Sequence, residues 1–89
     1  MEKEYFIKGK RYVVKPSTRR NKKYDVYTDD RYLLSFGDNR YEQYNDRIGY
    51  YSNLNHYDKN RRNSYKSRHH FDNINNPNYA GYWSWWFLW

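Results

Sequence analysis

Residues 5–36, YFIKGKRYVVKPSTRRNKKYDVYTDDRYLLSF, determine the fold that we expect for this chain. They hold four short runs rich in β-branched and aromatic residues, at positions 5–7, 11–15, 24–27 and 32–36. Turn-forming residues separate the runs, among them Gly9, Pro16 and the pair Asp29-Asp30. Such runs joined by short connections predict an antiparallel meander of three to four strands.

Alternation within the third run indicates how the sheet is covered. Tyr24 and Val26 alternate with Asp25 and Tyr27, so we expect one face of the sheet to be packed and the other to face water. The residues available for a core are mostly aromatic: hydrophobic residues make up 37% of the chain, and aromatic residues alone make up 24%. A Tyr-rich composition suits a thin core and large contact surfaces, and it argues strongly against an aliphatic enzyme core.

The sequence after the sheet predicts helices. Tyr41, Tyr44, Ile48 and Tyr51 recur at helical spacing and predict a helix that Gly49 ends early. A second helix is expected over residues 59–69, and Asp58 stands where a helix N-cap is needed. The predicted fold class is therefore α+β: a small antiparallel meander followed by one or two short helices and an aromatic C-terminal tail.

The C-terminal tail is the most distinctive feature of the sequence. We divide the chain into a basic α+β domain at 1–72, an Asn/Pro-rich linker at 73–78 and an aromatic anchor at 79–89. The anchor residues are Tyr82, Trp83, Trp85, Trp86, Phe87, Leu88 and Trp89. A cluster of this size has to be covered by something. It either completes the core of its own domain or inserts into a partner subunit, and contact with a bilayer interface is the least favoured of the three alternatives.

Positive charge is concentrated in two segments. The chain has 17 basic and 10 acidic residues, a net charge of +7 and a pI near 9.6. The candidate residues for binding phosphate or an acidic surface are Arg19, Arg20, Lys22 and Lys23 in one connection and Lys59, Arg61, Arg62, Lys66 and Arg68 in the second helix. Several phosphate contacts would give salt-sensitive, sequence-independent binding. An acidic protein neighbour explains the same residues equally well.

No constellation of residues in the sequence indicates catalysis. Cysteine is absent, which removes disulfides, thiolate metal sites and thiol nucleophiles, and fits a reducing site of assembly. His56, His69 and His70 lack further ligands at metal-binding spacing. Phosphate loops and nucleophile elbows are also absent, and no apolar run suits a signal peptide or a membrane span. We therefore expect a non-enzyme without a cofactor, a metal or a small-molecule substrate.

Many spaced positions resemble a family of short basic proteins of unassigned function encoded by large DNA viruses and tailed bacteriophages. The similar positions are residues 15–17, 21–24, 35–38, 40–41, 43–44, 46, 48–49, 51–52, 56, 58–59, 61–62, 65, 68–69, 80–81, 83–85 and 88–89. Trp86 and the Asn-rich spacer at 73–78 depart from that pattern. The resemblance implies a viral protein without an established enzymatic role, and it transfers no catalytic residue.

Together these features predict a virion structural protein, a minor capsid or cement component. Its expected partners are major capsid subunits and, in addition, packaged DNA. Its expected location is the virion, and the host cytoplasm or nucleus during assembly. The alternative is a non-enzymatic viral nucleic-acid-binding accessory protein that acts in replication, transcription or packaging.

Overall fold

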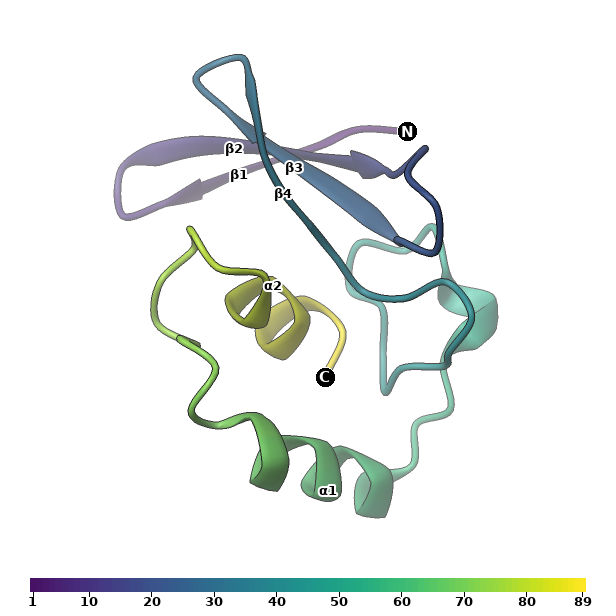
Figure 1. The fold of residues 1–89 in the computed structure, drawn as a ribbon. Coiled ribbons are helices and arrows are strands. Elements are labelled where there is room, and N and C mark those ends of the chain that lie inside the picture. Colours follow the sequence, from purple (N-terminus) through teal and green to yellow (C-terminus); the bar gives the residue numbers. More distant parts are fainter.

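The computed structural model describes all 89 residues and has an antiparallel sheet with its strands in sequence order. The strands are β1 (Lys3–Ile7), β2 (Lys10–Pro16), β3 (Tyr24–Thr28) and β4 (Arg31–Phe36). All three neighbouring pairs are antiparallel. The four predicted runs are the four strands, and the predicted α+β class is confirmed (Figure 1).

Two tight turns fix the meander. Lys8 and Gly9 join β1 to β2 with φ angles of 52° and 77°, and Asp29 and Asp30 join β3 to β4 with φ angles of 53° and 59°. Positive φ at both central residues is the geometry whose twist matches that of a hairpin. The connection from β2 to β3, residues 17–23, is longer and is described below as the basic loop.

The helices lie together on one side of the sheet. A short 3₁₀ turn, η1 (Ser52–Leu54), precedes α1 (Lys59–His69), and α2 (Ala80–Phe87) follows. Figure 1 shows α2 between the sheet and α1. The side chain of Asp58 accepts hydrogen bonds from the backbone N–H groups of Asn60 and Arg61, so the predicted N-cap of α1 is confirmed. No helix combines the length and the apolar character that crossing a membrane requires.

The helix predicted around Tyr41, Tyr44, Ile48 and Tyr51 is wrong. Residues 37–51 form turns and irregular backbone. The side chain of Asp46 accepts hydrogen bonds from the N–H groups of Ile48 and Tyr51, and Gly49 has a φ of +105°. An aspartate that bonds its own neighbouring backbone competes with helix formation, and the positive φ is incompatible with a continuing helix.

The core lies between the sheet and α2. It consists of Tyr12, Val14, Tyr24, Val26, Phe36, Ile48, Trp83 and Leu88. Trp83 is fully buried, and its ring is 5.5 Å from that of Tyr12 and 5.9 Å from that of Phe36. The aromatic tail thus supplies bulk that the aliphatic residues of this chain cannot supply.

The polar segment at 73–78 is held firmly to α2. The indole N–H of Trp83 donates to the carbonyl oxygen of Pro77 at 2.8 Å, and that of Trp86 donates to Ile74 at 2.8 Å. Gly81 lies against the backbone of Asp72, because a Cβ atom built at Gly81 would be only 2.2 Å from the Asp72 carbonyl oxygen. The tail therefore packs as a part of the domain.

Candidate nucleic-acid interface

Most acidic side chains are engaged within the protein. Eight of the ten accept hydrogen bonds or form ion pairs: Glu4, Asp25, Asp29, Asp38, Glu42, Asp46, Asp58 and Asp72. Only Glu2 and Asp30 have no such partner, and both lie on the sheet face that the helices do not cover. The excess positive charge is consequently left on the rest of the surface.

The basic residues of α1 are largely used inside the fold. Arg61 pairs with Glu42 at 2.9 Å. Arg62 donates to the main-chain oxygen of Trp89 at 2.9 Å and lies over the ring of Tyr44. The ammonium group of Lys66 lies 4.4 Å from the ring centre of Trp85. Lys59 and Arg68 form no ion pair or hydrogen bond through their side chains, so they are the two of the five predicted residues that have no partner within the fold.

The basic loop is anchored at several points. The N–H of Ser17 donates to Lys23, that of Lys22 to Arg19, and that of Lys23 to the carbonyl of Gly37. Asn21 adopts a φ of +63°, a conformation that asparagine tolerates better than most residues. These bonds give the loop a defined shape, from which the exposed side chains of Arg20 and Lys22 extend without a protein partner.

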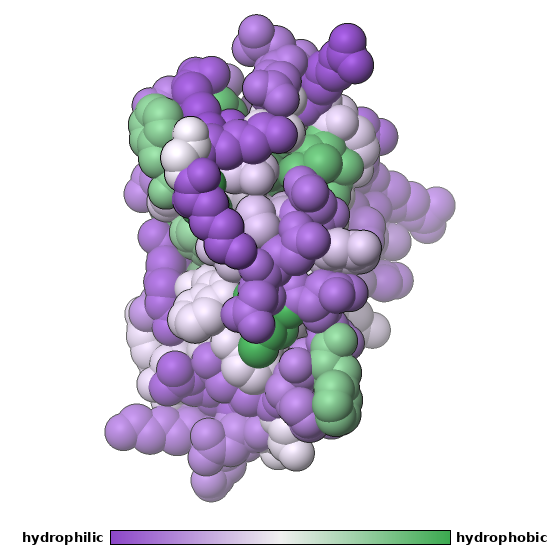
Figure 2. Space-filling model, turned by 90° about the vertical axis from the view of Figure 1, so that its left-hand side faces the viewer, coloured by the Kyte–Doolittle hydropathy of each residue, from purple (hydrophilic) through white to green (hydrophobic).

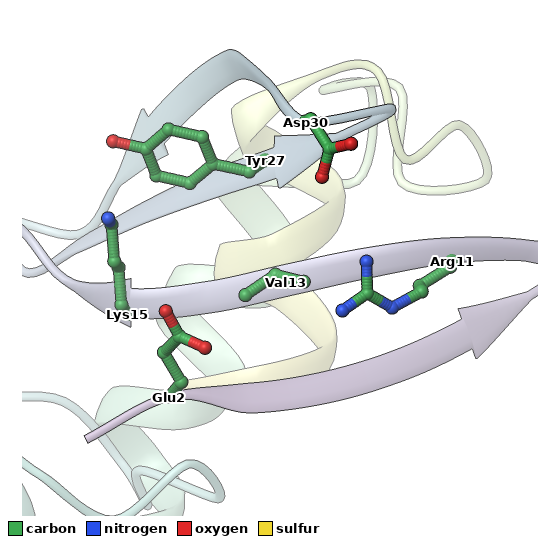
Figure 3. Close-up of a pocket in the computed structure, with 6 residues that line it drawn as sticks. All are labelled: Glu2, Arg11, Val13, Lys15, Tyr27 and Asp30. Carbon is green, nitrogen blue, oxygen red and sulfur yellow. The ribbon is translucent and has the colours of Figure 1, made fainter.

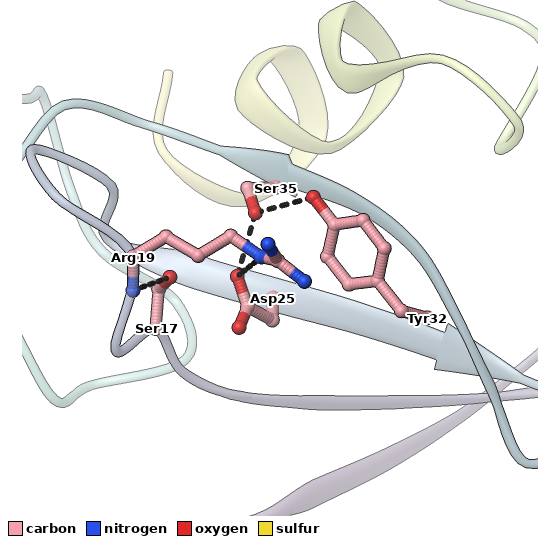
Figure 4. A network of polar contacts seen from close by, with 5 residues as sticks. All are labelled: Ser17, Arg19, Asp25, Tyr32 and Ser35. Atoms are coloured by element: carbon pink, nitrogen blue, oxygen red, sulfur yellow. Dashed lines mark hydrogen bonds and ion pairs between the residues drawn. The ribbon is translucent and has the colours of Figure 1, made fainter.

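Arg19 is held against the uncovered face of the sheet. Its guanidinium carbon lies 3.8 Å from the ring centre of Tyr32, and its Nε lies 3.8 Å from the carboxylate of Asp25. Asp25 is buried and also accepts a 2.6 Å bond from Ser35, whose hydroxyl contacts that of Tyr32. Figure 4 shows this network, in which the Arg19 side chain reaches from the loop across β3 toward β4. Neither Nη group has a protein acceptor, so both are free to donate to a ligand.

Lys23 does not belong to the exposed basic surface, which corrects the sequence prediction. Its side chain is 2% exposed, and its ammonium group donates to the side-chain oxygen of Gln43. Gln43 in turn donates to the carbonyl of Tyr51 and to Asn55. Lys23 therefore joins the basic loop to residues 43–55 and cannot reach a phosphate.

Burial of Lys23 leads to a pH-dependent stability. Desolvation lowers the pKa of Lys23 to about 8 from an ordinary value of 10.5. Between those values the unfolded chain binds the proton and the folded chain does not, so the free energy of unfolding rises with pH. Above pH 10 the trend reverses, because burial raises the pKa of Tyr24 and raises that of Tyr65 to about 12.

The expected result is a melting temperature that increases from pH 8 toward pH 10 and falls above pH 10. Differential scanning calorimetry at several pH values measures it. The Lys23→Met variant is the control, because its melting temperature should rise much less over the same interval. An equal rise in both proteins would assign the effect to the decline of the overall positive charge.

A second buried polar group, Asp46, organises residues 45–51. Its carboxylate accepts hydrogen bonds from the hydroxyl of Tyr24 and from the N–H groups of Ile48 and Tyr51. Tyr24 hydroxyl accepts in turn from the N–H of Tyr50 at 3.1 Å. This network attaches an irregular segment to the centre of the sheet.

Replacing Asp46 by alanine should lower the free energy of unfolding by about 3 kcal/mol, since it leaves buried donors without an acceptor. Chemical denaturation followed by circular dichroism measures the change. The control variant Glu2→Ala removes an exposed carboxylate that has no partner and lies outside the turns, and it should change the stability by no more than about 0.5 kcal/mol. Similar losses in the two variants would contradict an anchoring role for Asp46.

The predicted anchor residues of the tail divide into buried and exposed members. Trp83 and Leu88 are buried; Tyr82, Trp85, Phe87 and Trp89 are partly buried; and Trp86 is 49% exposed. Trp89 stacks on Tyr65 of α1 with 4.4 Å between the ring centres. In Figure 2, the side of the molecule seen there is mostly hydrophilic and its hydrophobic areas are small and separate.

A concavity on the uncovered face of the sheet does not suit an anion. It is a shallow cleft of about 340 Å³ on the uncovered sheet face, lined by Glu2, Arg11, Val13, Lys15, Tyr27 and Asp30. Figure 3 shows the two acidic and the two basic side chains around it. The charges balance, and Arg11 is already paired with Glu4. No group of three or more His, Asp or Glu side chains is placed to hold a metal ion.

The comparisons with known proteins gave no relative: no family model matches this chain, and no match was found among curated proteins or solved structures.

Asp25, Tyr32 and Ser35 also belong to the site and were not predicted from the sequence. A signal for two of them was present in the alternation of β3 and β4, since Asp25 and Ser35 are polar positions paired across the two strands. Nothing local to the sequence indicated that Arg19 would fold onto them.

Proposed function

We propose that the protein is a non-enzymatic component of a virus particle, a minor capsid or cement protein that binds polyanionic surfaces. The observation that supports this is the distribution of charge: internal contacts engage most of the acids, and the basic loop presents Arg19, Arg20 and Lys22 outward. Acidic surface of major capsid subunits and packaged DNA are the partners that such a loop fits.

The placement of the tail changes how this role would be performed. A cement protein anchored by its aromatic residues needs them free, whereas Trp83 and Leu88 fill the core. Contact with neighbouring subunits is then made by charge, supplemented by the exposed ring of Trp86. The assignment to a virus rests on the resemblance described above.

Quantitative mass spectrometry of purified, nuclease-treated virions tests the proposal. A structural component should be present in tens to hundreds of copies that scale with the capsid subunits. Its absence from virions, together with its presence in infected cells, would reject a structural role.

The second candidate is a nucleic-acid-binding accessory protein in replication, transcription or packaging. The stacking of Arg19 on Tyr32 favours it, because an arginine plane held on an aromatic ring can stack on a base, which a carboxylate does not offer. This role predicts residence in the host cytoplasm or nucleus, and the same mass spectrometry distinguishes the two candidates.

A further inference from the structure

We propose that the uncovered face of the sheet, at the end formed by the basic loop and β4, binds single-stranded nucleic acid. Arg19 and Tyr32 form a stacking platform for a base, and Arg20 and Lys22 contact the adjacent phosphates. This inference deepens the polyanion binding proposed above, since it names the ligand and selects one of the two basic segments.

The platform is built before any ligand arrives. Arg19 rests on Tyr32 at 3.8 Å, and the buried carboxylate of Asp25 stands beside its Nε. Its backbone N–H also donates to the hydroxyl of Ser17 at 2.9 Å. Because Tyr32 covers one side of the guanidinium plane, the other side is available to a base, and both Nη groups can donate to a phosphate or to a base edge.

The charges beside the platform fit a flexible polyanion. Arg20 and Lys22 are exposed or partly exposed and have no acidic partner within ion-pair distance. The next segment, residues 37–41, lies alongside through the bond from Asn39 to Asn21. It adds Arg40, whose charge is balanced by Asp38 at 2.7 Å, and the exposed ring of Tyr41.

A second cation–aromatic pair marks the direction of the bound strand. Lys15 lies 4.5 Å from the ring centre of Tyr27, and Tyr27 packs edge to face against Tyr32 at 6.0 Å. Beyond Tyr27 the cleft contains Glu2 and Asp30, which have no cation within ion-pair distance. Because Arg11 and Lys15 line the same cleft, its charges balance and it adds no net attraction for a phosphate backbone, so the path ends at Tyr27.

Single strands fit this face better than duplex. A duplex keeps its bases stacked inside and offers phosphates to cations alone, whereas a single strand also offers the free base faces that stacking platforms bind. On α1, in contrast, the cations that lie over Tyr44 and Trp85 are only partly exposed, whereas the Arg19 side chain over Tyr32 is 52% exposed.

Fluorescence anisotropy with a labelled ten-nucleotide oligothymidine and with a duplex of equal length tests the proposal. The wild-type chain should bind the single strand at least tenfold more tightly. Arg19→Lys keeps the charge and removes the planar guanidinium, so single-strand affinity should fall about tenfold while duplex affinity changes little. A duplex bound as tightly as the single strand, or equal losses for both ligands, would overturn the stacking platform.

A matched pair of double variants tests the assignment to the basic loop. Arg20→Ala with Lys22→Ala should reduce the steepness of the plot of log affinity against log salt by about 1.4, at about 0.7 per lost phosphate contact. Lys59→Ala with Arg68→Ala removes the same charge from α1 and should leave that slope unchanged. Equal changes in the two doubles would show a diffuse electrostatic attraction and overturn the assignment.

These outcomes are separable from the proposed virion role. Oligonucleotide binding by the purified chain does not depend on where the protein resides. If the chain binds oligothymidine but is absent from virions, this inference is retained and the structural role is rejected. If the chain is present in virions but does not bind oligothymidine, the structural role is retained and this inference is rejected. Circular dichroism of each variant verifies that the fold is retained, as expected for side chains at the surface.

Discussion

Replacing Trp83 by alanine is expected to remove most of the stability of the protein, so that the variant is close to unfolding at room temperature. The indole is fully buried, contacts Tyr12, Phe36 and Phe87, and ties Pro77 to α2 through its N–H. Truncating a buried Trp costs about 3–5 kcal/mol. Small domains have total stabilities at the low end of about 5–15 kcal/mol, so this single change removes most of the stability.

Urea denaturation followed by far-ultraviolet circular dichroism measures the loss. Trp86→Ala is the matched control, because it removes the same side chain from the same helix at a position that is 49% exposed. It should cost about 1–2 kcal/mol, including the hydrogen bond to Ile74. Equal losses at the two positions would mean that the tail does not fill the core in solution.

Gly81→Ala should give the second large effect, and its sign is the opposite of what helix propensity predicts. In a helix interior, alanine is ordinarily more stable than glycine by about 1 kcal/mol. Here the added Cβ atom would lie 2.2 Å from the carbonyl oxygen of Asp72 and 2.8 Å from its Cβ. Backbone atoms cannot move aside cheaply, so the free energy of unfolding should fall by about 3 kcal/mol.

Asn63→Ala is the control for this prediction. Asn63 is an exposed residue within α1, and its replacement should change stability by no more than about 0.5 kcal/mol, in the stabilising direction. The same denaturation experiment compares the two variants. A stabilised Gly81→Ala protein would show that α2 does not approach Asp72 as closely as described.

The sheet could be predicted from the sequence because its signals are local. The residues of each strand are adjacent in the chain, and Lys8-Gly9 and Asp29-Asp30 are two-residue turns between them. The N-cap of α1 could also be predicted from the sequence, because Asp58 accepts hydrogen bonds from N–H groups only two and three residues away. Alternation along the chain was sufficient to predict the strands, and local hydrogen bonding was sufficient to predict the N-cap.

The prediction failed where side chains bond across the fold. Helical spacing of Tyr41, Tyr44 and Ile48 was overridden by Asp46, whose carboxylate is shared between its own segment and Tyr24 of β3. Lys23 stands in a basic run, and only its packing beneath Gly37 and beside Gln43 turns it inward. No sequence pattern distinguishes such a lysine from its exposed neighbours.

The candidate site was predicted in part for the same reason. A run of cations is visible in the sequence, so residues 17–23 could be identified. On α1, three of the basic side chains contact other parts of the fold: Arg61, Arg62 and Lys66. These contacts depend on where Glu42, Tyr44 and the tail lie in the folded chain. The selection of the loop over the helix therefore required the structure.

We expect the chain to fold on its own around its aromatic tail and to bind single-stranded nucleic acid through Arg19, Arg20, Lys22 and Tyr32. A ¹H–¹⁵N correlation spectrum of the full chain, recorded without and with oligothymidine, tests both expectations. We expect a dispersed spectrum with a slowly exchanging Trp83 indole N–H in the free protein, and shifts on titration confined to the basic loop and neighbouring β4. A spectrum that becomes dispersed only when a partner is added, or shifts centred on residues 82–89, would contradict these expectations.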